Sequence, residues 1–184
     1  RFFGRTVKIS LLQNARSGLC PEDCSYCSQS AISTASINKY RLLSTAQLVA
    51  GAYKAVEAGA RRYCMVTSGR GPSDRDIEQL GEAVRTIKHE FPDLEICLSL
   101  GLMSEPQARQ LKEAGVGWVN HNLNTSRRFY PEICTTHTYD DRVETVQNVK
   151  RAGLSTCSGG IIGMGESDED ILDLAYAARE LAID

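Results

Sequence analysis

The chain lacks any long hydrophobic run. None of its apolar stretches approaches the roughly 18–20 residues that a membrane-spanning helix needs. Its first residues also lack the charged start and apolar middle of a signal peptide. Neither sign of charge dominates, since 21 basic residues stand against 23 acidic ones and the net charge is -2. From these absences we expect a cytoplasmic protein that acts on neither nucleic acid nor membranes.

The cysteine content also gives no sign of a disulfide framework. The seven cysteines are an odd number in a chain of ordinary globular composition, 42% hydrophobic. Such usage favours thiols that stay reduced and serve as ligands. The chain has no starting methionine, and it ends where an apolar run begins after a helical pattern. We therefore expect residues 1–184 to be a single domain that is incomplete at both ends.

Apolar strand patterns alternate with amphipathic helix patterns along the chain, with a period of about 30 residues. Strands are expected near 7–12, 61–67, 94–100, 117–123 and 154–162, and helices near 44–58, 74–90, 104–114, 139–152 and 167–182. Three serines suit helix starts as capping residues, namely Ser44, Ser104 and Ser167. Three glycines suit the left-handed position at helix ends, namely Gly59, Gly115 and Gly153.

This alternation implies right-handed crossovers and a parallel sheet, either an open doubly wound sheet or a barrel. Two features favour the barrel. No phosphate-binding glycine fingerprint follows the first strand. Polar and cysteine residues lie within the strands, where a barrel interior can hold a cofactor. We therefore expect an α/β fold, a (β/α) TIM-type barrel truncated to about five βα units plus the start of a sixth.

Three cysteines, Cys20, Cys24 and Cys27, crowd into the loop after the first strand, in the order Cys-Pro-Glu-Asp-Cys-Ser-Tyr-Cys. These spacings let a short loop wrap three thiolates around one corner of an iron–sulfur cube and leave a fourth iron without a protein ligand. A structural zinc site is the alternative, although zinc modules usually close all four positions with two separated pairs of ligands. Tyr26 is a candidate to stack on a planar group, with a surface tyrosine as the alternative.

Three further cysteines, Cys64, Cys97 and Cys157, lie on predicted strands at similar depth. Any one of them alone is best explained as a small buried hydrophobic residue. Three that point inward from strands of one barrel can converge on a second iron–sulfur cluster.

Polar side chains mark the predicted fourth strand. Asn120, Asn122 and Asn124 alternate there, so that they share one face while His121 faces the other way. Three amides inside a barrel are costly unless they are hydrogen-bonded, and a ligand rich in donors and acceptors would satisfy them. The alternative is a polar strand end that pairs with neighbouring loops. For His121 we expect a structural histidine with satisfied hydrogen bonds.

Together these motifs resemble the biotin synthase family of radical S-adenosylmethionine enzymes, over nearly the whole chain. The cysteine loop alone points only to the superfamily, whereas the combination is specific. The residues that carry the resemblance are Ser17 to Cys27, Tyr63-Cys-Met65, Val119-Asn-His-Asn-Leu-Asn-Thr-Ser126, Thr135-Thr-His-Thr-Tyr139 and Cys157-Ser-Gly-Gly-Ile-Ile-Gly-Met-Gly-Glu166. The resemblance implies that a 5'-deoxyadenosyl radical removes hydrogen from dethiobiotin and that sulfur from a second cluster is inserted to form biotin.

The resemblance also implies roles for single residues. The implied metal ligands are Cys20, Cys24 and Cys27 for a 4Fe-4S cluster and Cys64, Cys97 and Cys157 for a 2Fe-2S cluster. The implied contacts to S-adenosyl-L-methionine come from Tyr26, Asn122, Asn124, Arg142, Gly160 and Gly163. Asn120 and Asn122 are implied to lie beside dethiobiotin. Arg142 would pair with the methionine carboxylate, with a solvated helical arginine as the alternative, and the two glycines would let the backbone approach the adenine. Cys134 matches no ligand position of the family.

By the same resemblance we expect a homodimer that receives electrons from a donor such as flavodoxin or ferredoxin. Two alternatives stay open from the residues alone. One is another radical S-adenosylmethionine enzyme of similar barrel, of the hydrogenase-maturation or mutase type. The other is a non-enzymatic iron–sulfur or zinc-binding module.

Overall fold

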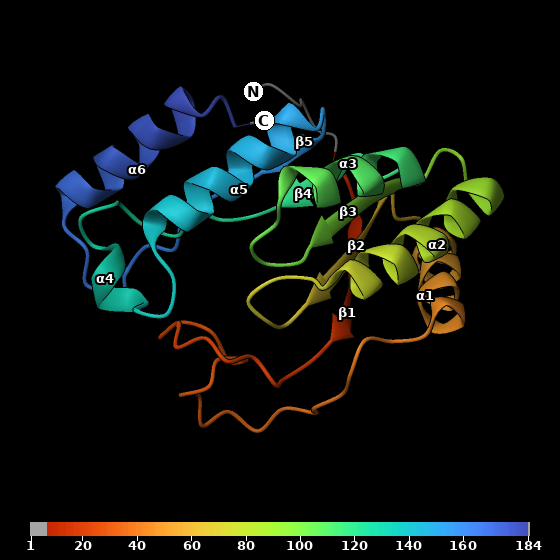
Figure 1. Ribbon diagram of the computed structural model, residues 1–184, viewed down its shortest axis with the longest axis horizontal. Coiled ribbons are helices and arrows are strands. Elements are labelled where there is room, and N and C mark those ends of the chain that lie inside the picture. Colours follow the sequence, from red (N-terminus) through yellow and green to blue (C-terminus); the bar gives the residue numbers. More distant parts are fainter. Residues whose placement is uncertain (1–6, 184) are drawn as a thin grey trace.

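A sheet of five parallel strands forms the centre of the molecule (Figure 1), and the computed structural model describes residues 7–183. The strands lie side by side in chain order. They are β1 (Ser10–Arg16), β2 (Arg62–Thr67), β3 (Glu95–Ser99), β4 (Trp118–Asn120) and β5 (Ser155–Cys157). Because neighbouring strands are parallel, each connection must return the chain to the same edge of the sheet, and helices do so here.

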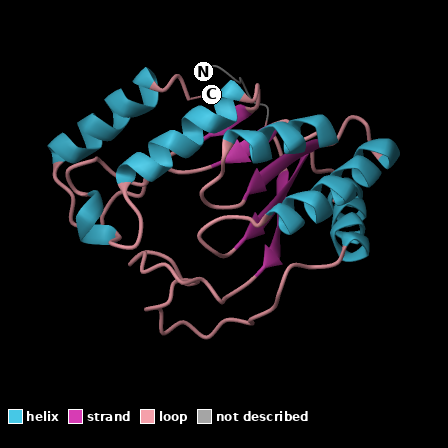
Figure 2. Cartoon of the chain, in the orientation of Figure 1, coloured by secondary structure: helices cyan, strands magenta, loops and turns pink. Residues whose placement is uncertain are grey.

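The helices are α1 (Thr45–Glu57), α2 (Asp74–Glu90), α3 (Glu105–Ala114), α4 (Tyr130–Ile133), α5 (Tyr139–Arg151) and α6 (Asp168–Glu180). Helices α1, α2, α3 and α5 cover one face of this sheet, whereas α6 lies beside α4 and α5 (Figure 2). Alternate residues of β2 and β3, such as Tyr63, Met65 and Ile96, belong to one buried cluster with apolar side chains of α1, α2 and α3. The main hydrophobic core therefore lies between the sheet and these helices.

The opposite face of the sheet, here called the inner face, carries the other half of each strand, since successive side chains point to opposite sides. Its residues are Ser10, Leu12, Asn14, Arg62, Cys64, Val66, Glu95, Cys97, Ser99, Trp118, Asn120, Ser155 and Cys157. The Arg62 guanidinium lies 4.0 Å above the Trp118 ring and donates to the Glu95 carboxylate at 2.9 Å. A face that carries charge, amides and thiols is suited to a cofactor rather than to a dry core.

The helices begin where their sequences predict. Ser44, Ser104 and Ser167 each accept a hydrogen bond from the backbone three residues on, and the side chain there bonds back to the serine backbone. Ser73 and Thr138 form the same capping box on α2 and α5. Each box provides partners for backbone N–H groups that a helix start leaves unpaired, so these side chains fix where the helices start.

The expected left-handed glycines after α1, α3 and α5 are confirmed, with φ of 71° at Gly59, 107° at Gly115 and 74° at Gly153. A residue with a Cβ is strained in this conformation, which is why glycine ends these helices. The chain then turns directly into the next strand.

Gly101, just after β3, combines a left-handed φ of 86° with a close backbone neighbour, because a Cβ there would lie 2.3 Å from the Arg70 carbonyl oxygen. Gly59 shares the conformation but faces open space. We expect Gly101→Ala to lower the free energy of unfolding by about 2–4 kcal/mol and Gly59→Ala by about 1 kcal/mol. Urea unfolding of the full-length protein measures both losses. Equal losses would contradict the steric explanation.

The predicted α/β fold is confirmed, and the sheet order is that of consecutive barrel strands. In the part of the chain that the structure describes, β1 and β5 form the two edges and the sheet does not close. Residues 181–183 after α6 form no strand, so the start of a sixth unit is not seen in the described range; Asp184 lies outside it. Within residues 7–183 no helix combines the length and apolarity that crossing a membrane requires.

Three strands differ from the predicted ranges by more than two residues at one end or both, while the other predicted elements agree to within two residues. β1 runs over Ser10–Arg16 rather than 7–12, because the polar residues Gln13 and Asn14 continue the pairing with β2. β4 and β5 are shorter than the ranges 117–123 and 154–162. The short helix α4 was not predicted.

Candidate active site

A cavity lies at the C-terminal ends of β2, β3 and β4, and the loop after β1 contributes to its wall. Cys20, Cys24 and Cys27 all line it. Cys24 is buried, Cys20 and Cys27 are partly exposed, and all three are free thiols. The structure therefore brings the three loop cysteines to one space, at the end of the strands where barrels keep their active sites.

The cysteine loop is held by residues 133–138, which comprise the last residue of α4 and the segment after it. The Ser25 N–H donates to the Ile133 carbonyl oxygen at 2.9 Å. The Asp23 carboxylate accepts from the backbone N–H of Thr135 at 2.9 Å and from that of Thr136 at 3.2 Å. Hydrogen bonds from Thr135 hold the pKa of Asp23 well below its ordinary value. The position of Cys24 thus depends on contacts that cross about half the chain.

Because the pKa of Asp23 is lowered on folding, this contact stabilises the protein above the ordinary pKa of aspartate, about 4, and the stabilisation is lost as the pH falls below it. We expect Asp23→Ala to lower the urea midpoint at pH 7. The difference in urea midpoint between wild type and variant should shrink as the pH is lowered from 5 to 3, because the Asp23 carboxylate stabilises the folded protein less in this range. Urea unfolding of cluster-free, full-length protein measures this. A constant difference across that range would show that the charge has no part in the contact.

The strand thiols gather on the inner face below the cavity. Cys64 and Cys97 are direct partners in the register of β2 and β3. The hydrogen bond from Cys97 lowers the pKa of Cys64 to about 7, helped by the nearby Arg62 charge, while the same contact and burial raise the pKa of Cys97. Cys64 is therefore the thiol of this pair that loses its proton first.

Cys157 lies on the same face and contributes to the raised pKa of Cys97. In the sheet, Cys97 pairs with Trp118 of β4, whereas Cys157 pairs with Asn120, two residues further along the same strand. Cys157 is therefore offset by two residues, about 7 Å along the strands, toward the cavity. The expectation of similar depth holds for Cys64 and Cys97 and is wrong for Cys157.

Asn120, Asn122 and Asn124 all line the cavity. β4 ends at Asn120, so the other two asparagines lie in the chain that leaves the strand. The Asn120 amide is 3.5 Å from the Asn122 side-chain oxygen. Asn124 has a φ of 72°, which asparagine tolerates, and its amide donates to the Tyr26 hydroxyl at 2.5 Å. The predicted row of amides is present, although a turn rather than a strand places its last member.

Arg142, at the start of α5, reaches the same cavity. Its Nε donates to the Tyr130 hydroxyl at 2.5 Å, Nη1 to the Asn122 carbonyl oxygen at 2.8 Å and Nη2 to the Tyr26 hydroxyl at 3.2 Å. All three partners are neutral, and the largest influences on the pKa of Arg142 are its burial and the neighbouring Tyr26, Tyr130 and Cys24. Two of the five guanidinium N–H groups are left over, so a partly buried positive charge that has no ion-pair partner within the described residues faces the cavity.

His121 departs from expectation. It lines the cavity together with the asparagines instead of facing away from them. The residue is only 6% exposed, and its Nε2 has no hydrogen-bond partner within the described residues. Burial, reinforced by the Arg142 charge, holds the pKa of His121 well below its ordinary value, so the ring is neutral. The expected histidine with satisfied bonds is therefore wrong, and the cause is that strand alternation stops at Asn120.

Gly160 and Gly163, the implied adenine contacts, are not among the residues that line this cavity. Gly160 pairs with Asn124, and a Cβ on it would lie 2.2 Å from a Leu174 methyl group and 3.0 Å from the Asn124 carbonyl oxygen. The glycine is thus explained by packing against α6. The contact of Gly160 and Gly163 with an adenine stays a prediction.

Glu22 and His137 are among the residues of the cavity wall for which the sequence predicted no role. Both are buried, and the His137 Nδ1 lies 2.5 Å from the Glu22 carboxylate. Burial raises the pKa of Glu22, but hydrogen bonds from Thr136 and His137 outweigh it and leave the pKa lowered. Burial lowers the pKa of His137. Each belongs to a motif that carries the family resemblance, but their contact joins residues 115 positions apart and gives no local signal.

Comparison with known proteins places this site in context. A family model described as the Radical SAM superfamily matches residues 16–176. Biotin synthase 2 of Frankia casuarinae is 55% identical over 184 residues, which are 100% of this chain and 51% of that protein. The biotin synthases of Streptomyces coelicolor and Bacillus subtilis are 53% and 51% identical, over 98% and 100% of this chain and 44% and 54% of theirs. The chain thus spans about half the length of the curated relatives it matches.

Solved structures of lower sequence identity share the fold. The crystal structure of methylornithine synthase (PylB) matches 100% of this chain and 53% of its own with a TM-score of 0.85 at 22% identity. The hydrogenase maturase HydG from Carboxydothermus hydrogenoformans matches 95% of this chain and 41% of its own with a TM-score of 0.79 at 23% identity. At such identities these matches show a common architecture and nothing finer.

Proposed function

Since the chain belongs to the radical SAM superfamily, we propose that it forms part of a biotin synthase, which inserts sulfur into dethiobiotin to give biotin. The observation that carries the proposal is identity of 51–55% to curated biotin synthases along the whole chain. A site that combines two separate sets of three thiols supports it. When bound, the clusters and S-adenosylmethionine supply a carbon-centred radical and the sulfur to be inserted.

The loop thiols fit a 4Fe-4S cluster held by Cys20, Cys24 and Cys27. All three line one cavity, and the contacts of Asp23 and Ser25 with residues 133–138 hold the loop around the buried member. Three thiolates leave one iron of the cube free for S-adenosylmethionine. The role of the chain here is to set which side of the cavity that iron faces.

Arg142 fits the carboxylate of S-adenosylmethionine. It presents a guanidinium with two unused N–H groups and no ion-pair partner in the described part of the chain, and a planar fork matches a carboxylate better than any other side chain does. Tyr26, which bonds both Arg142 and Asn124, would hold these two groups in place and flank the cofactor.

The amides fit the sugar of the same molecule, with Asn122 and Asn124 for the ribose hydroxyls. Asn124 can donate and accept hydrogen bonds but carries no charge. We therefore expect its contact with a ribose hydroxyl to be weaker than the contact that an aspartate at this position would make. Asn120 and Asn122 would form the wall beside dethiobiotin. The neutral, unpartnered Nε2 of His121 adds a further polar contact to the same wall.

The inner-face thiols fit a 2Fe-2S cluster held by Cys64, Cys97 and Cys157. The low pKa of Cys64 makes one thiolate available near neutral pH, and iron binding would deprotonate the others. The offset of Cys157 along the strands would place this ligand on the side of the inner face nearest the cavity proposed to hold dethiobiotin.

The partners follow from the same proposal. We place the enzyme in the reducing cytoplasm as a homodimer that receives electrons from flavodoxin or ferredoxin. The single barrel domain over residues 1–184 stays a prediction.

Anaerobic turnover of the full-length protein tests the proposal. With dethiobiotin, S-adenosylmethionine and a strong reductant, we expect biotin and 5'-deoxyadenosine, both measured by mass spectrometry. Cleavage of S-adenosylmethionine without any biotin would favour another radical SAM reaction. Absence of both products from protein that carries its clusters would refute the proposal.

A further inference from the structure

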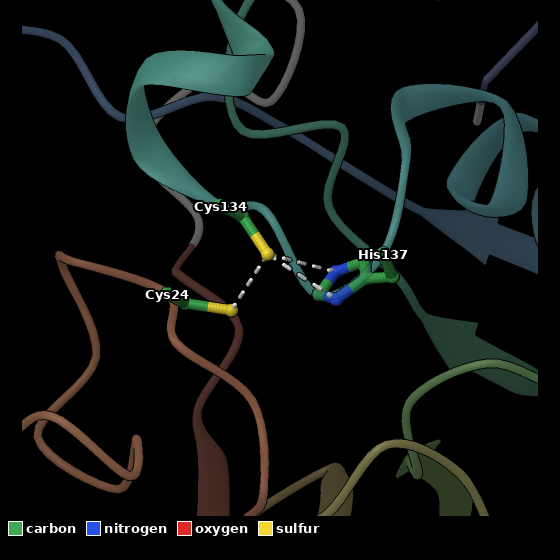
Figure 3. Close-up of side chains that lie close together, drawn as sticks. All are labelled: Cys24, Cys134 and His137. Atoms are coloured by element: carbon green, nitrogen blue, oxygen red, sulfur yellow. Dashed lines mark hydrogen bonds between the residues drawn. The ribbon is translucent and has the colours of Figure 1, made fainter.

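Cys24, Cys134 and His137 bring two thiols and an imidazole together in the wall of the site (Figure 3). The Cys24 and Cys134 sulfurs are 3.7 Å apart, and the Cys134 sulfur lies 3.3 Å from the His137 Nδ1. Every ligand atom of the three lies within 4.8 Å of the others. All three residues are buried, with exposures of 4–7%. Neither Cys134 nor His137 has a part in the function proposed above.

These distances match those of a tetrahedral metal site. Two sulfurs that each lie about 2.3 Å from one zinc ion are about 3.8 Å apart at the tetrahedral angle, against the 3.7 Å found between Cys24 and Cys134. A sulfur and an imidazole nitrogen on the same ion would be about 3.6 Å apart, and the two His137 nitrogens lie 3.3 and 3.9 Å from the Cys134 sulfur. The third pair, the Cys24 sulfur and a His137 nitrogen, lies within 4.8 Å, so one ion can be bound once side-chain movement closes this last separation.

The surroundings hold the imidazole as metal sites usually do. The Glu22 carboxylate lies 2.5 Å from the Nδ1 of His137, and the Tyr130 hydroxyl lies 2.8 Å from its Nε2. A carboxylate that orients a ligating histidine is a regular feature of zinc sites.

An ion has two routes to this group. Cys24 and His137 line the cavity of the candidate active site, while Cys134 and His137 line a second pocket between α4 and the start of α5. The site is therefore buried without being sealed.

We propose that, in protein without the 4Fe-4S cluster, Cys24, Cys134 and His137 bind one thiol-seeking divalent cation of the zinc class. Thiolate and imidazole ligands favour zinc over magnesium or calcium. Because Cys24 belongs both to this triad and to the loop trio, the cation and the cluster exclude each other. Zinc bound here would hold the cysteine loop closed and block cluster assembly. The exclusion rests on the proposed function, whereas the cation site itself does not.

Cobalt(II), a spectroscopic substitute for zinc, tests this on anaerobic, cluster-free, full-length protein. We expect one equivalent to bind with the visible absorption of a tetrahedral thiolate site, and zinc to displace it. Cys134→Ala should weaken cobalt binding at least about 100-fold while iron and sulfide analysis still finds a 4Fe-4S cluster after reconstitution. That cluster also shows that the variant folds. His137→Gln should also weaken cobalt binding, as a second and independent test of the same site.

Cys20→Ala is the matched control, because it removes a thiol of the loop trio that is outside the triad. It should abolish the 4Fe-4S cluster and leave cobalt binding within about twofold of wild type. The reverse pattern, in which Cys20→Ala loses cobalt and Cys134→Ala keeps it, would place the cation on the loop trio and overturn the proposal. No tetrahedral spectrum in wild type would also overturn it. Since no turnover is involved, a protein that binds cobalt at the triad but makes no biotin would contradict only the proposed function.

Discussion

Full-length protein with Cys27→Ala is expected to hold no 4Fe-4S cluster and to cleave S-adenosylmethionine at least about 1,000-fold more slowly, a loss of roughly 4 kcal/mol in transition-state stabilisation. The reason is geometric. Cys20, Cys24 and Cys27 line one cavity from one loop, and two thiolates leave two irons of the cube open instead of one. Iron and sulfide content and the electron paramagnetic resonance spectrum after reduction measure the cluster, and release of 5'-deoxyadenosine measures the cleavage.

Cys134→Ala is the control for this variant, since it removes a buried thiol 3.7 Å from the Cys24 sulfur without touching the trio. It should keep the cluster. A Cys27→Ala protein with a full complement of cubane iron would show that the loop is not the ligand set.

The second large effect concerns Arg142. We expect Arg142→Ala to weaken the binding of S-adenosylmethionine about 10- to 100-fold, or 1.4–2.8 kcal/mol, because the guanidinium is the cation of the cavity that has no anionic partner in the described residues. Arg142→Lys should recover only part of the loss, since an ammonium lacks the planar fork. Equilibrium binding to cluster-loaded protein measures both.

Arg127→Ala supplies the matched control. Arg127 is an exposed arginine that pairs with Asp140 at the same end of α5 and does not line the cavity. It should leave the affinity unchanged. Equal affinities of Arg142→Ala and wild type would remove Arg142 from the proposed site, provided that cluster content shows the variant to be folded.

Local signals in the sequence predicted the fold well. Capping serines such as Ser44 and left-handed glycines such as Gly115 act within one helical turn, and both features lie where the pattern placed them. The chain-order parallel sheet follows from their repetition. β1 was misplaced because Gln13, although polar, turns toward the helices and accepts a hydrogen bond from the Tyr63 hydroxyl. The alternation of apolar and polar residues cannot reveal a partly buried polar side chain whose hydrogen-bond partner lies far away in the sequence.

The candidate site was predictable where one segment provides several of its residues. Cys20, Cys24 and Cys27 share a loop, and the asparagines share a strand end. The orientation of His121 was not predictable, because alternation holds only to Asn120 and the chain then turns. Cys134 received no predicted role, because its contact with Cys24 spans 110 residues. Contacts between distant segments depend on the packing of the whole fold, which spacing alone does not encode.

The central claim is that one barrel carries two thiol sets with separate clusters, and Mössbauer spectra with anaerobic iron and sulfide analysis test it most directly. The proteins to compare are full-length wild type and a triple variant with Cys64→Ala, Cys97→Ala and Cys157→Ala. The proposal predicts a 4Fe-4S cluster in both and a second cluster in wild type alone. If both proteins hold the same single cluster, the inner-face cysteines are packing residues and the assignment of sulfur insertion is contradicted.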